Sequence, residues 1–457
     1  MPGDRNGAEA ETETDTDLTE THVVTVFLRN GGDVLLLRRS DAVGSYSGRW
    51  GAVAGHADGD PQAAAREEIR EETGLDPETE TTLVRWGDPF EVVDRDLGKR
   101  WVVHASLFDC QSRAIEPNEE TTEYEWAPPT AILRRETVPE LWTSYERVRP
   151  TPEAVAADRD HGSAYISLRA LEVLRDEAAL AVEGGDGDGN GDGDGNSDSD
   201  GKATSTWTAL EAVARELLEA RPSMAVVTNR VDRAVHAASE SADPAALERT
   251  AHEGINRATA ADADAAALAA DRFPDSVATL SRSGTVAAAV ERADPVVILV
   301  AESRPGREGV GTAERFAETT DATLTLTTDA ALADRLAATG VEALVVGADT
   351  VLPDGQVVNK VGTRGAALAA ANEGVDCYVV AASEKIAPAG ADDAVDREER
   401  DPAEVYDGDA DLRVANPTFD VTPAESVDAV VTERGVLDTD GIGAVAEEHR
   451  ELGEWRR

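Results

Sequence analysis

Three glutamates stand at helical spacing in the first half of the chain. Glu68, Glu71 and Glu72 occupy positions i, i+3 and i+4, so a helix would present their carboxylates on one face. Such close like charges repel, and a divalent cation relieves the repulsion. Hard oxygen ligands are those that Mg²⁺ takes when it also holds substrate phosphates. Because the whole chain is acidic, a solvated helix face is the alternative interpretation.

Helix-ending residues frame these glutamates. Asp60 can cap a helix with its side chain, Pro61 suits a first turn, and Gly74 suits the left-handed residue after a last turn. The sequence therefore predicts a helix from Pro61 to Thr73.

The first part of the chain is expected to be an α+β domain over residues 21–147, after a disordered acidic tail over residues 1–20. Two hairpin-like pairs of β-rich runs, with the predicted helix between the pairs, indicate this fold. The runs pair as 22–28 with 34–37 and as 90–94 with 101–108. The tail has no apolar core of the kind that an export signal needs.

The stretch GHADGDPQAAAREEIREETGL, residues 55–75, resembles the Nudix box, whose pattern is G-x5-E-x7-R-E-U-x-E-E-x-G-U with U aliphatic. The resemblance implies a Nudix fold that hydrolyses a nucleoside diphosphate linked to another group, with Mg²⁺ or Mn²⁺ offsetting the diphosphate charge. It places Glu68, Glu71 and Glu72 on the family's metal-binding glutamates. Gly55 falls on its first glycine, at the substrate, and Glu68 is the first candidate for the catalytic base.

Two departures from the box concern its geometry. The segment is two residues shorter than the pattern, with Asp60 roughly where the first glutamate belongs. Glu67 replaces the box arginine, and Arg66 lies one place early. Further acidic residues before Trp126 could add a metal ligand, with a solvated loop as the alternative; they are Glu119, Glu120 and Glu123.

Lysine is rare in this chain, with four residues among 43 basic side chains. Two of the four lie at predicted strand ends, Lys360 after Asn359 and Lys385 after Glu384. A compact ammonium differs from a planar guanidinium as a phosphate partner. These two lysines therefore indicate phosphate binding, with ordinary ion pairs to nearby acid as the alternative.

Four short apolar runs in the second half of the chain predict parallel strands that are buried on both faces. The runs PVVILVA, ATLTLT, ALVVGA and DCYVVAA begin at residues 295, 322, 343 and 376. Helical spacing over residues 164–182 and again after residue 204 predicts a helical subdomain before the sheet. The chain is thus expected to be α/β overall, with a Rossmann-like doubly wound sheet whose ligand binds outside the carboxyl ends of the strands.

Several motifs of this half resemble one family, which unites the alpha, beta and delta regulatory subunits of eukaryotic translation initiation factor 2B with ribose-1,5-bisphosphate and methylthioribose-1-phosphate isomerases. The motifs VAESRPGREG, TTDAA, VGADTVLPDGQVVNKVGT and NPTFDVTPAESVDAVVTERG begin at residues 300, 327, 346 and 416, in the family's order. HGSAYISLRAL, residues 161–171, resembles the family's first helix. A family domain is therefore expected over residues 152–457.

The same resemblance implies site residues. The family's isomerases use a cysteine after a Thr-His pair and the aspartate of a Gly-Ala-Asp motif; Asp349 matches the aspartate, and Ser281 stands at the cysteine position after Leu280. Because a serine is a far weaker acid than a thiol, isomerase activity is doubtful and a regulatory role is favoured. Residues suited to binding a phosphate or nucleotide are Ser281, Arg304, Asn359, Lys360 and Gly362.

An Asp/Gly-rich segment over residues 183–203 contains no apolar core and is predicted to be a flexible insertion. Part of it resembles a calcium-binding loop, from Asp186 to Gly191, which is the alternative. The twelfth position of such a loop needs a bidentate glutamate, and here it is Ser197.

The charge balance excludes two classes of partner. Ninety-one acidic residues against 43 basic ones give a net charge of −48, so direct capture of nucleic acid or of an anionic membrane is not expected. Acid spread along both halves, with little lysine, is typical of halophilic proteins. Cys110 and Cys377 lie far apart with no metal-ligand spacing, which fits a reducing cytoplasm. No stretch is apolar for long enough to span a membrane.

The main hypothesis is a cytoplasmic protein in which Nudix hydrolysis is coupled to an initiation factor 2B-like regulatory domain that binds a phosphorylated metabolite or nucleotide. Two alternatives stay open: a non-catalytic regulatory or assembly protein, and a sugar phosphate isomerase. Copies of the same chain or a translation initiation factor are the expected protein partners.

Overall fold

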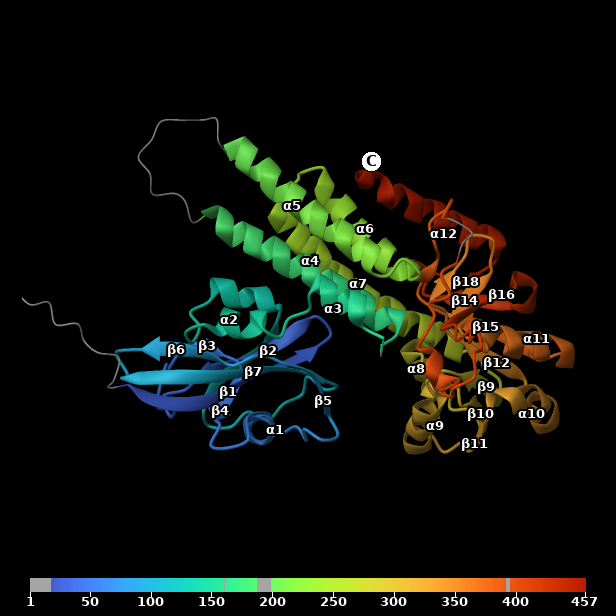
Figure 1. Cartoon of the computed structure of the whole chain (residues 1–457), viewed down its shortest axis with the longest axis horizontal. Coiled ribbons are helices and arrows are strands. Elements are labelled where there is room, and N and C mark those ends of the chain that lie inside the picture. Colours follow the sequence, from blue (N-terminus) through green and yellow to red (C-terminus); the bar gives the residue numbers. More distant parts are fainter. Residues whose placement is uncertain (1–17, 160, 187–198, 392–394) are drawn as a thin grey trace, which may run out of the picture. The chain divides into compact units, whose positions relative to one another are not determined.

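The computed structural model describes residues 18–159, 161–186, 199–391 and 395–457. The chain divides into two compact units, Met1–Arg149 and Pro150–Arg457 (Figure 1). Most of the predicted acidic tail therefore lies outside the described residues, as does the middle of the predicted insertion. None of the described helices is both long enough and apolar enough to cross a membrane.

The first unit is built on a mixed sheet. Its central pair, β1 (Thr19–Asn30) and β7 (Lys99–Cys110), runs parallel. Both predicted hairpins are confirmed, since β1 pairs antiparallel with β2 (Asp33–Arg39), and β6 (Phe90–Asp94) pairs antiparallel with β7. The remaining described strands of the sheet are β3 (Trp50–Gly51), β4 (Val53–His56), β5 (Thr81–Trp86) and β8 (Thr121–Ala127).

Helix α1 (Pro61–Thr73) has the bounds and the caps that the sequence predicts. The Asp60 side chain accepts a hydrogen bond from the Gln62 N–H at 3.0 Å, and Gly74 adopts a left-handed φ of 74°. The buried face of the helix carries Ala65, Ile69, Glu72 and Thr73, so an acidic residue is packed with apolar ones against the sheet. A shorter helix, α2 (Leu141–Glu146), follows the last strand of the unit.

The second unit begins with the predicted helical subdomain. Its helices α4, α5, α6 and α7 pack on one another and run side by side in Figure 1. They follow a short helix, and the bounds are α3 (Pro152–Ala157), α4 (Ser163–Asp186), α5 (Ser199–Ala220), α6 (Ala225–Ser239) and α7 (Pro244–Ala270). The predicted insertion over residues 183–203 is thus helical at both of its described ends, and residues 187–198 lie outside the described part of the chain.

A seven-stranded sheet follows, in the order β11-β10-β9-β12-β15-β17-β18. The four predicted strands are confirmed as β10 (Val297–Ala301), β11 (Thr323–Thr327), β12 (Ala343–Val346) and β15 (Asp376–Val380). The other strands are β9 (Ser276–Leu280), β17 (Ala429–Thr432) and β18 (Gly435–Leu437). The order reverses between β9 and β12, because the chain runs outward from β9 through β10 to β11 and then returns to the other side of β9.

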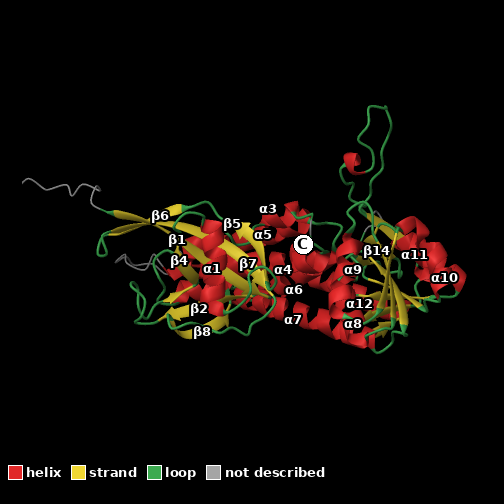
Figure 2. Ribbon diagram, turned by 90° about the horizontal axis from the view of Figure 1, so that it is seen from below, coloured by secondary structure: helices red, strands yellow, loops and turns green. Residues whose placement is uncertain are grey.

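Helices cover both faces of this sheet (Figure 2). One face packs against α10 (Leu332–Thr339), α11 (Thr363–Glu373) and α12 (Thr439–Leu452). The opposite face packs against α7, α8 (Gly284–Ala293) and α9 (Glu308–Thr319). A small sheet of β13 (Thr350–Val351), β14 (Val357–Lys360) and β16 (Phe419–Thr422) completes the unit.

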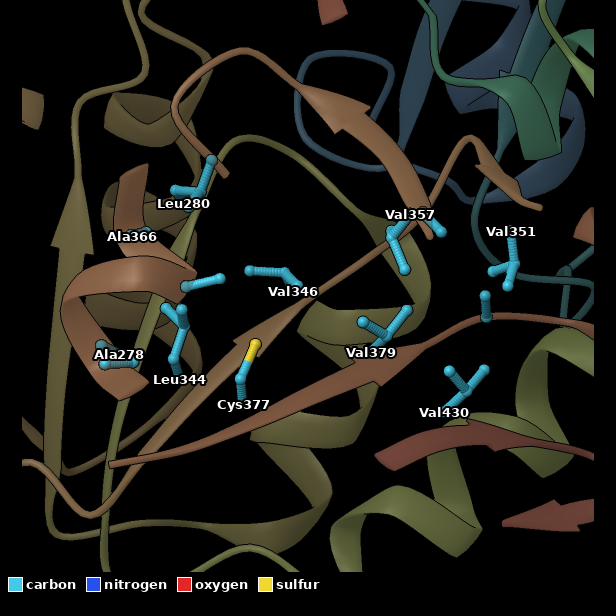
Figure 3. Close-up of a cluster of buried hydrophobic side chains, with 14 of the residues drawn as sticks. Ala278, Leu280, Leu344, Val346, Val351, Val357, Ala366, Cys377, Val379 and Val430 are labelled. Atoms are coloured by element: carbon cyan, nitrogen blue, oxygen red, sulfur yellow. The ribbon is translucent and has the colours of Figure 1, made fainter. Parts of the chain in front are cut away.

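The apolar core on the first of these faces supports the ends of the central strands. Figure 3 shows Leu280, at the end of β9, and Val346, at the end of β12, among its buried side chains. Both side chains are nearly inaccessible, at 4% and 1% exposed. The loops that leave these two strands therefore start from a rigid base.

Two glycines of α9 allow the packing of this helix to be tested. A Cβ added at Gly309 would come within 1.9 Å of the Ala301 carbonyl oxygen, whereas one at Gly311 would meet nothing within 4 Å. Because the first obstacle is backbone, we expect Gly309→Ala to destabilise the second unit by about 1–3 kcal/mol. Gly311→Ala should instead stabilise it slightly, because alanine favours helix. Thermal unfolding and hydrogen exchange of β10 measure both effects; a Gly309→Ala variant as stable as Gly311→Ala would contradict the packing.

Candidate functional sites

A cavity of about 440 Å³ opens beside α1 in the first unit. It brings together three of the predicted site residues, Gly55, Glu68 and Glu71. Glu120 also lines it, as one of the acidic residues proposed as an extra ligand, whereas Glu119 and Glu123 are not among the lining residues. Other lining side chains include Arg39, Tyr46, His56, Lys99 and Trp101.

The glycine at position 55 makes room for Glu68. A Cβ there would lie 1.6 Å from the Glu68 Oε1 atom, closer than any two unbonded atoms can approach. This close approach places the carboxylate against strand β4 at the cavity wall. The predicted substrate role of Gly55 is thus accompanied by a geometric one, because a larger residue would require the Glu68 carboxylate to move.

Burial and mutual repulsion dominate the protonation of the acidic cluster. Burial, followed by the charges of Glu71, Glu120 and Glu67, raises the pKa of Glu68 to about 7. Burial also raises the pKa of Glu72 to about 8, because it outweighs the 3.3 Å hydrogen bond from the Ala54 N–H, and the charge of Glu68 adds to the rise. These carboxylates therefore retain protons that ordinary glutamates release, unless a cation joins them.

The donors fit an open, hydrated metal site rather than a closed one. Among the described residues, no group of three or more His, Cys, Asp or Glu side chains is arranged to hold a metal ion. Glu72 is 5% exposed and accepts from backbone, while Glu71 is exposed. Mg²⁺, however, keeps several waters and needs only one or two direct carboxylates beside substrate phosphates. Glu68, Glu71 and Glu120 offer these oxygens to the cavity.

Part of the opposite cavity wall consists of aromatic residues that the sequence interpretation missed. The Tyr46 hydroxyl donates to Asp94 at 2.7 Å and accepts from the Trp101 indole N–H at 3.1 Å. The Lys99 ammonium lies 4.4 Å from the centre of the Trp101 ring. No local signal predicts this wall, because Tyr46 comes from a loop far in sequence from the hairpin that carries the other three.

The buried carboxylate of Glu72 gives a stability prediction. The folded state keeps its proton up to about pH 8, whereas the unfolded chain releases it near 4.5, so stability falls as pH rises through this window. Without divalent cations, we expect Glu72→Gln to be more stable than the parent at pH 8, by about 2 kcal/mol, and not at pH 4. Thermal unfolding at both pH values measures this, with exposed Glu67→Gln as the control. Equal stability of variant and parent at pH 8 would contradict the assignment.

The second unit contains a cavity of about 290 Å³ at the point where the strand order reverses. It is lined by residues 280–285, at the end of β9 and after it, and by residues 347–349, which follow β12. Ligands of open α/β sheets bind at such a switch point. Four predicted site residues meet there: Ser281, Asp349, Asn359 and Lys360.

Ser281 lies in a constrained turn. Its φ is 65°, its N–H donates to the Ser303 hydroxyl at 2.5 Å, and its carbonyl accepts from the Thr312 hydroxyl at 2.7 Å. Two residues later Ser283 caps α8 by accepting from the Val286 N–H at 3.3 Å. The amino terminus of α8 therefore lies at the cavity, where its free N–H groups favour an anion.

The lysines of the cavity are held in place. Lys360 donates to Glu308 at 2.5 Å, and Lys385 donates to the Ala348 carbonyl at 2.5 Å. Asn359 donates to the Thr363 hydroxyl at 3.0 Å. In contrast, the Asp349 carboxylate makes no hydrogen bond or ion pair with another described residue.

An ion network fixes the segment that carries Lys385. Its neighbour Glu384 lies 2.8 Å from Arg230, 3.4 Å from Arg233 and 3.7 Å from Arg257. Although burial opposes ionisation, these arginines hold the pKa of Glu384 below its ordinary range. The position of Lys385 is therefore set by helices α6 and α7.

Two predicted residues are not among those that line the cavity. The Arg304 side chain is exposed, and its N–H donates to Asp329 at 2.6 Å. Gly362 has a φ of 106° and donates its N–H to Asp420 at 2.8 Å, where α11 begins. Both backbone N–H groups thus serve turn geometry, and phosphate binding by these two residues stays a prediction.

Charged residues that the prediction missed complete the cavity. The basic lining residues within the described chain are Arg159, Arg221, Arg282, Lys360, Lys385 and Arg400. The acidic ones are Asp262, Glu308, Asp349 and Glu398. A local excess of positive charge in a chain of net charge −48 favours an anionic ligand. His161 also lines the cavity, from the segment that resembles the family's first helix.

Comparison with family models gives two matches. Residues 159–439 match the model described as the initiation factor 2 subunit family. Residues 19–148 match the model described as the NUDIX domain. The two matches fall within the two compact units.

Similar proteins include named isomerases. A ribose 1,5-bisphosphate isomerase of Haloferax volcanii is 36% identical over 248 residues, 51% of this chain and 76% of that protein. A methylthioribose-1-phosphate isomerase of Pseudomonas fluorescens is 28% identical over 344 residues, 67% of this chain and 89% of that protein. These names are at odds with the doubt about isomerase activity that Ser281 raised.

One solved structure supports the fold. The translation initiation factor eIF-2B of Pyrococcus horikoshii is 24% identical, with a TM-score of 0.51 over 63% of this chain and 94% of that one. The predicted α/β class and the order of the two domains are confirmed.

Proposed function

The chain belongs to the initiation factor 2 subunit family and carries a NUDIX domain at residues 19–148, and from this premise we propose that it acts on phosphorylated small molecules at two sites. The first unit hydrolyses a nucleoside diphosphate derivative with Mg²⁺ or Mn²⁺. The observation that carries this proposal is the cluster of Glu68, Glu71 and Glu120 at one cavity, with the protonation of Glu68 shifted to neutral pH.

The residues of this first cavity have separate roles in hydrolysis. Glu68, Glu71 and Glu120 would supply the carboxylates for Mg²⁺, which when bound would offset the diphosphate charge. Glu68 has a pKa of about 7, so near neutral pH it can accept a proton from the attacking water. Arg39 and Lys99 supply positive charge, and Trp101 supplies an apolar surface for the rest of the substrate.

The second unit supports a second candidate function, the binding and isomerisation of a phosphorylated sugar. The specific observation is the cationic cavity at the strand reversal, which is lined by Asp349, whose carboxylate accepts no hydrogen bond from another described residue. The names of the relatives favour isomerisation. If the ligand binds without turnover, the second unit instead senses that ligand and regulates hydrolysis in the first unit.

A substrate panel tests both functions together. The full chain is incubated with nucleoside diphosphate derivatives and with ribose phosphates at several KCl concentrations, with and without Mg²⁺. Released phosphate, nucleotide products and isomerised sugar are measured in each reaction. Nucleotide products that depend on Mg²⁺ support the first function, and a ketose product supports the second. If neither site turns over or binds any of these compounds, the proposal fails.

Two further parts of the hypothesis stay predictions. Assembly with copies of itself or with a translation initiation factor is testable by mass measurement in solution. A cytoplasmic location is consistent with Cys110 and Cys377, which are buried free thiols.

A further inference from the structure

We propose that His161 is the residue that donates a proton to the sugar in the second-unit cavity, in a pair with Asp349 as the acceptor. The proposal rests on the sugar isomerisation proposed above and assigns its proton donor. The substrate class is a pentose with a phosphate on C1, which the names of both isomerase relatives share.

The imidazole of His161 is fixed in orientation. Its Nδ1 atom lies 2.9 Å and 3.1 Å from the two carboxylate oxygens of Asp158, and its own main-chain N–H donates to the same carboxylate at 3.0 Å. The ring also stacks on Tyr165, with centroids 4.0 Å apart and an interplanar angle of 17°. The guanidinium of Arg169 lies 4.6 Å from the Tyr165 ring, which holds that ring in turn.

This arrangement defines which nitrogen can react. A carboxylate can only accept a hydrogen bond, so Asp158 fixes Nδ1 as a protonated nitrogen. The Nε2 atom has no hydrogen-bond partner among the described residues, and His161 is one of the residues that line the cavity with Ser281 and Asp349. Nε2 is therefore the nitrogen through which His161 would exchange a proton with a bound sugar.

The other lining groups are poor donors. Lys360 is paired with Glu308, and Lys385 is bonded to a backbone carbonyl. Arginine does not release its proton in proteins, and serine hydroxyls such as that of Ser281 are very weak acids. Among the described lining residues, His161 is the one imidazole, so it is the group best suited to donate.

The isomerisation balances with these two groups. The bond between C1 and the ring oxygen breaks, and that oxygen keeps the electron pair and takes a proton from Nε2. The hydrogen on C2 moves with its electron pair to C1. The C2 hydroxyl then loses its proton to Asp349, which forms the carbonyl of a 2-ketose 1-phosphate. Transfer of that proton back to His161 through water restores both groups.

Variants of His161 test the assignment on ribose 1,5-bisphosphate. We expect His161→Ala and His161→Gln to lower kcat by about 10²-fold or more, because general acid catalysis contributes about 10²- to 10⁴-fold. KM should change only a few-fold. Added imidazole should restore part of the kcat of His161→Ala, because it can occupy the space and donate a proton. His236→Gln, at an exposed histidine of α6, is the matched control and should retain kcat.

Three results would overturn the proposal. If His161→Ala retains kcat while Asp349→Asn loses it, the isomerase function stands and the donor is another group. If His161→Ala loses kcat without rescue by imidazole and with a matching loss of thermal stability, its role is structural. If the parent isomerises neither ribose 1,5-bisphosphate nor methylthioribose 1-phosphate, the proposed function fails together with this assignment.

Discussion

Glu68→Gln is expected to lower the rate of Mg²⁺-dependent hydrolysis of a nucleoside diphosphate derivative by about 10²- to 10⁴-fold. The amide keeps the shape of the side chain in the space that Gly55 leaves, so the fold should survive. It loses the negative charge that attracts the cation and the oxygen that accepts the proton of water. Both losses act on the transition state, so kcat should fall much more than KM rises.

The pH dependence of the parent supplies an independent readout. Because the pKa of Glu68 is about 7 without metal, hydrolysis at limiting Mg²⁺ should rise with pH between about 6 and 8. Saturating Mg²⁺ favours the ionised form and should move that rise to lower pH.

The control for this variant is Glu67→Gln, an exposed neighbour on the same helix that is not among the cavity-lining residues. It should retain kcat. A Glu68→Gln variant with more than a tenth of the parental rate would show that the base lies elsewhere, with Glu120 the next residue to test.

The success of the sequence prediction around α1 has a local cause. The side-chain cap of Asp60, the proline at the first turn and the left-handed glycine act within a few residues of one another, so they can be read from the chain directly. The burial of Glu72 and the close approach of Glu68 to Gly55 depend on strand β4 packing against the helix. The spacing of the glutamates on the helix predicts that their side chains lie on one face. Which of these carboxylates are buried, and therefore which retain their protons, is decided by packing alone.

The second cavity shows the opposite case. Strand β9 was missed because SVATL is short and carries polar residues, although it is the central strand at the reversal. Motif matching selected Ser281 and Asp349, which the fold brings to one cavity. It also selected Arg304 and Gly362, whose N–H groups bond to Asp329 and Asp420 in turns.

The basic side chains that distant helices bring to the cavity could not be predicted from the sequence. Arg221 follows α5, and it reaches the cavity only through the packing of the helical subdomain. His161 begins a recognised segment and Arg159 lies two residues before it, so that segment offered a signal that the site prediction did not use. When the packing of several helices brings residues together, the sequence around each residue gives no sign of that contact.

Asp349→Asn is expected to abolish most isomerisation of ribose 1,5-bisphosphate, lowering kcat by about 10²- to 10⁴-fold. The Asp349 N–H bonds to the Val358 carbonyl at 3.0 Å, so the backbone of this residue is held regardless of its side chain. The carboxylate makes no hydrogen bond within the described residues, and its replacement therefore leaves no broken contact behind. An amide cannot accept the proton of the C2 hydroxyl, so the ketone does not form.

Ligand affinity separates this chemical role from a binding role. The cationic side chains remain in Asp349→Asn, and one negative charge near the phosphates is removed, so calorimetry should give an equal or tighter Kd for ribose 1,5-bisphosphate. Asp376→Asn, an exposed aspartate at the start of β15, is the control and should change neither kcat nor Kd. If Asp349→Asn loses binding and turnover in parallel, Asp349 holds the sugar, and the base must be sought among Asp262, Glu308 and Glu398. If it retains turnover, the cavity acts through some other acceptor, and the assignment of Asp349 is wrong.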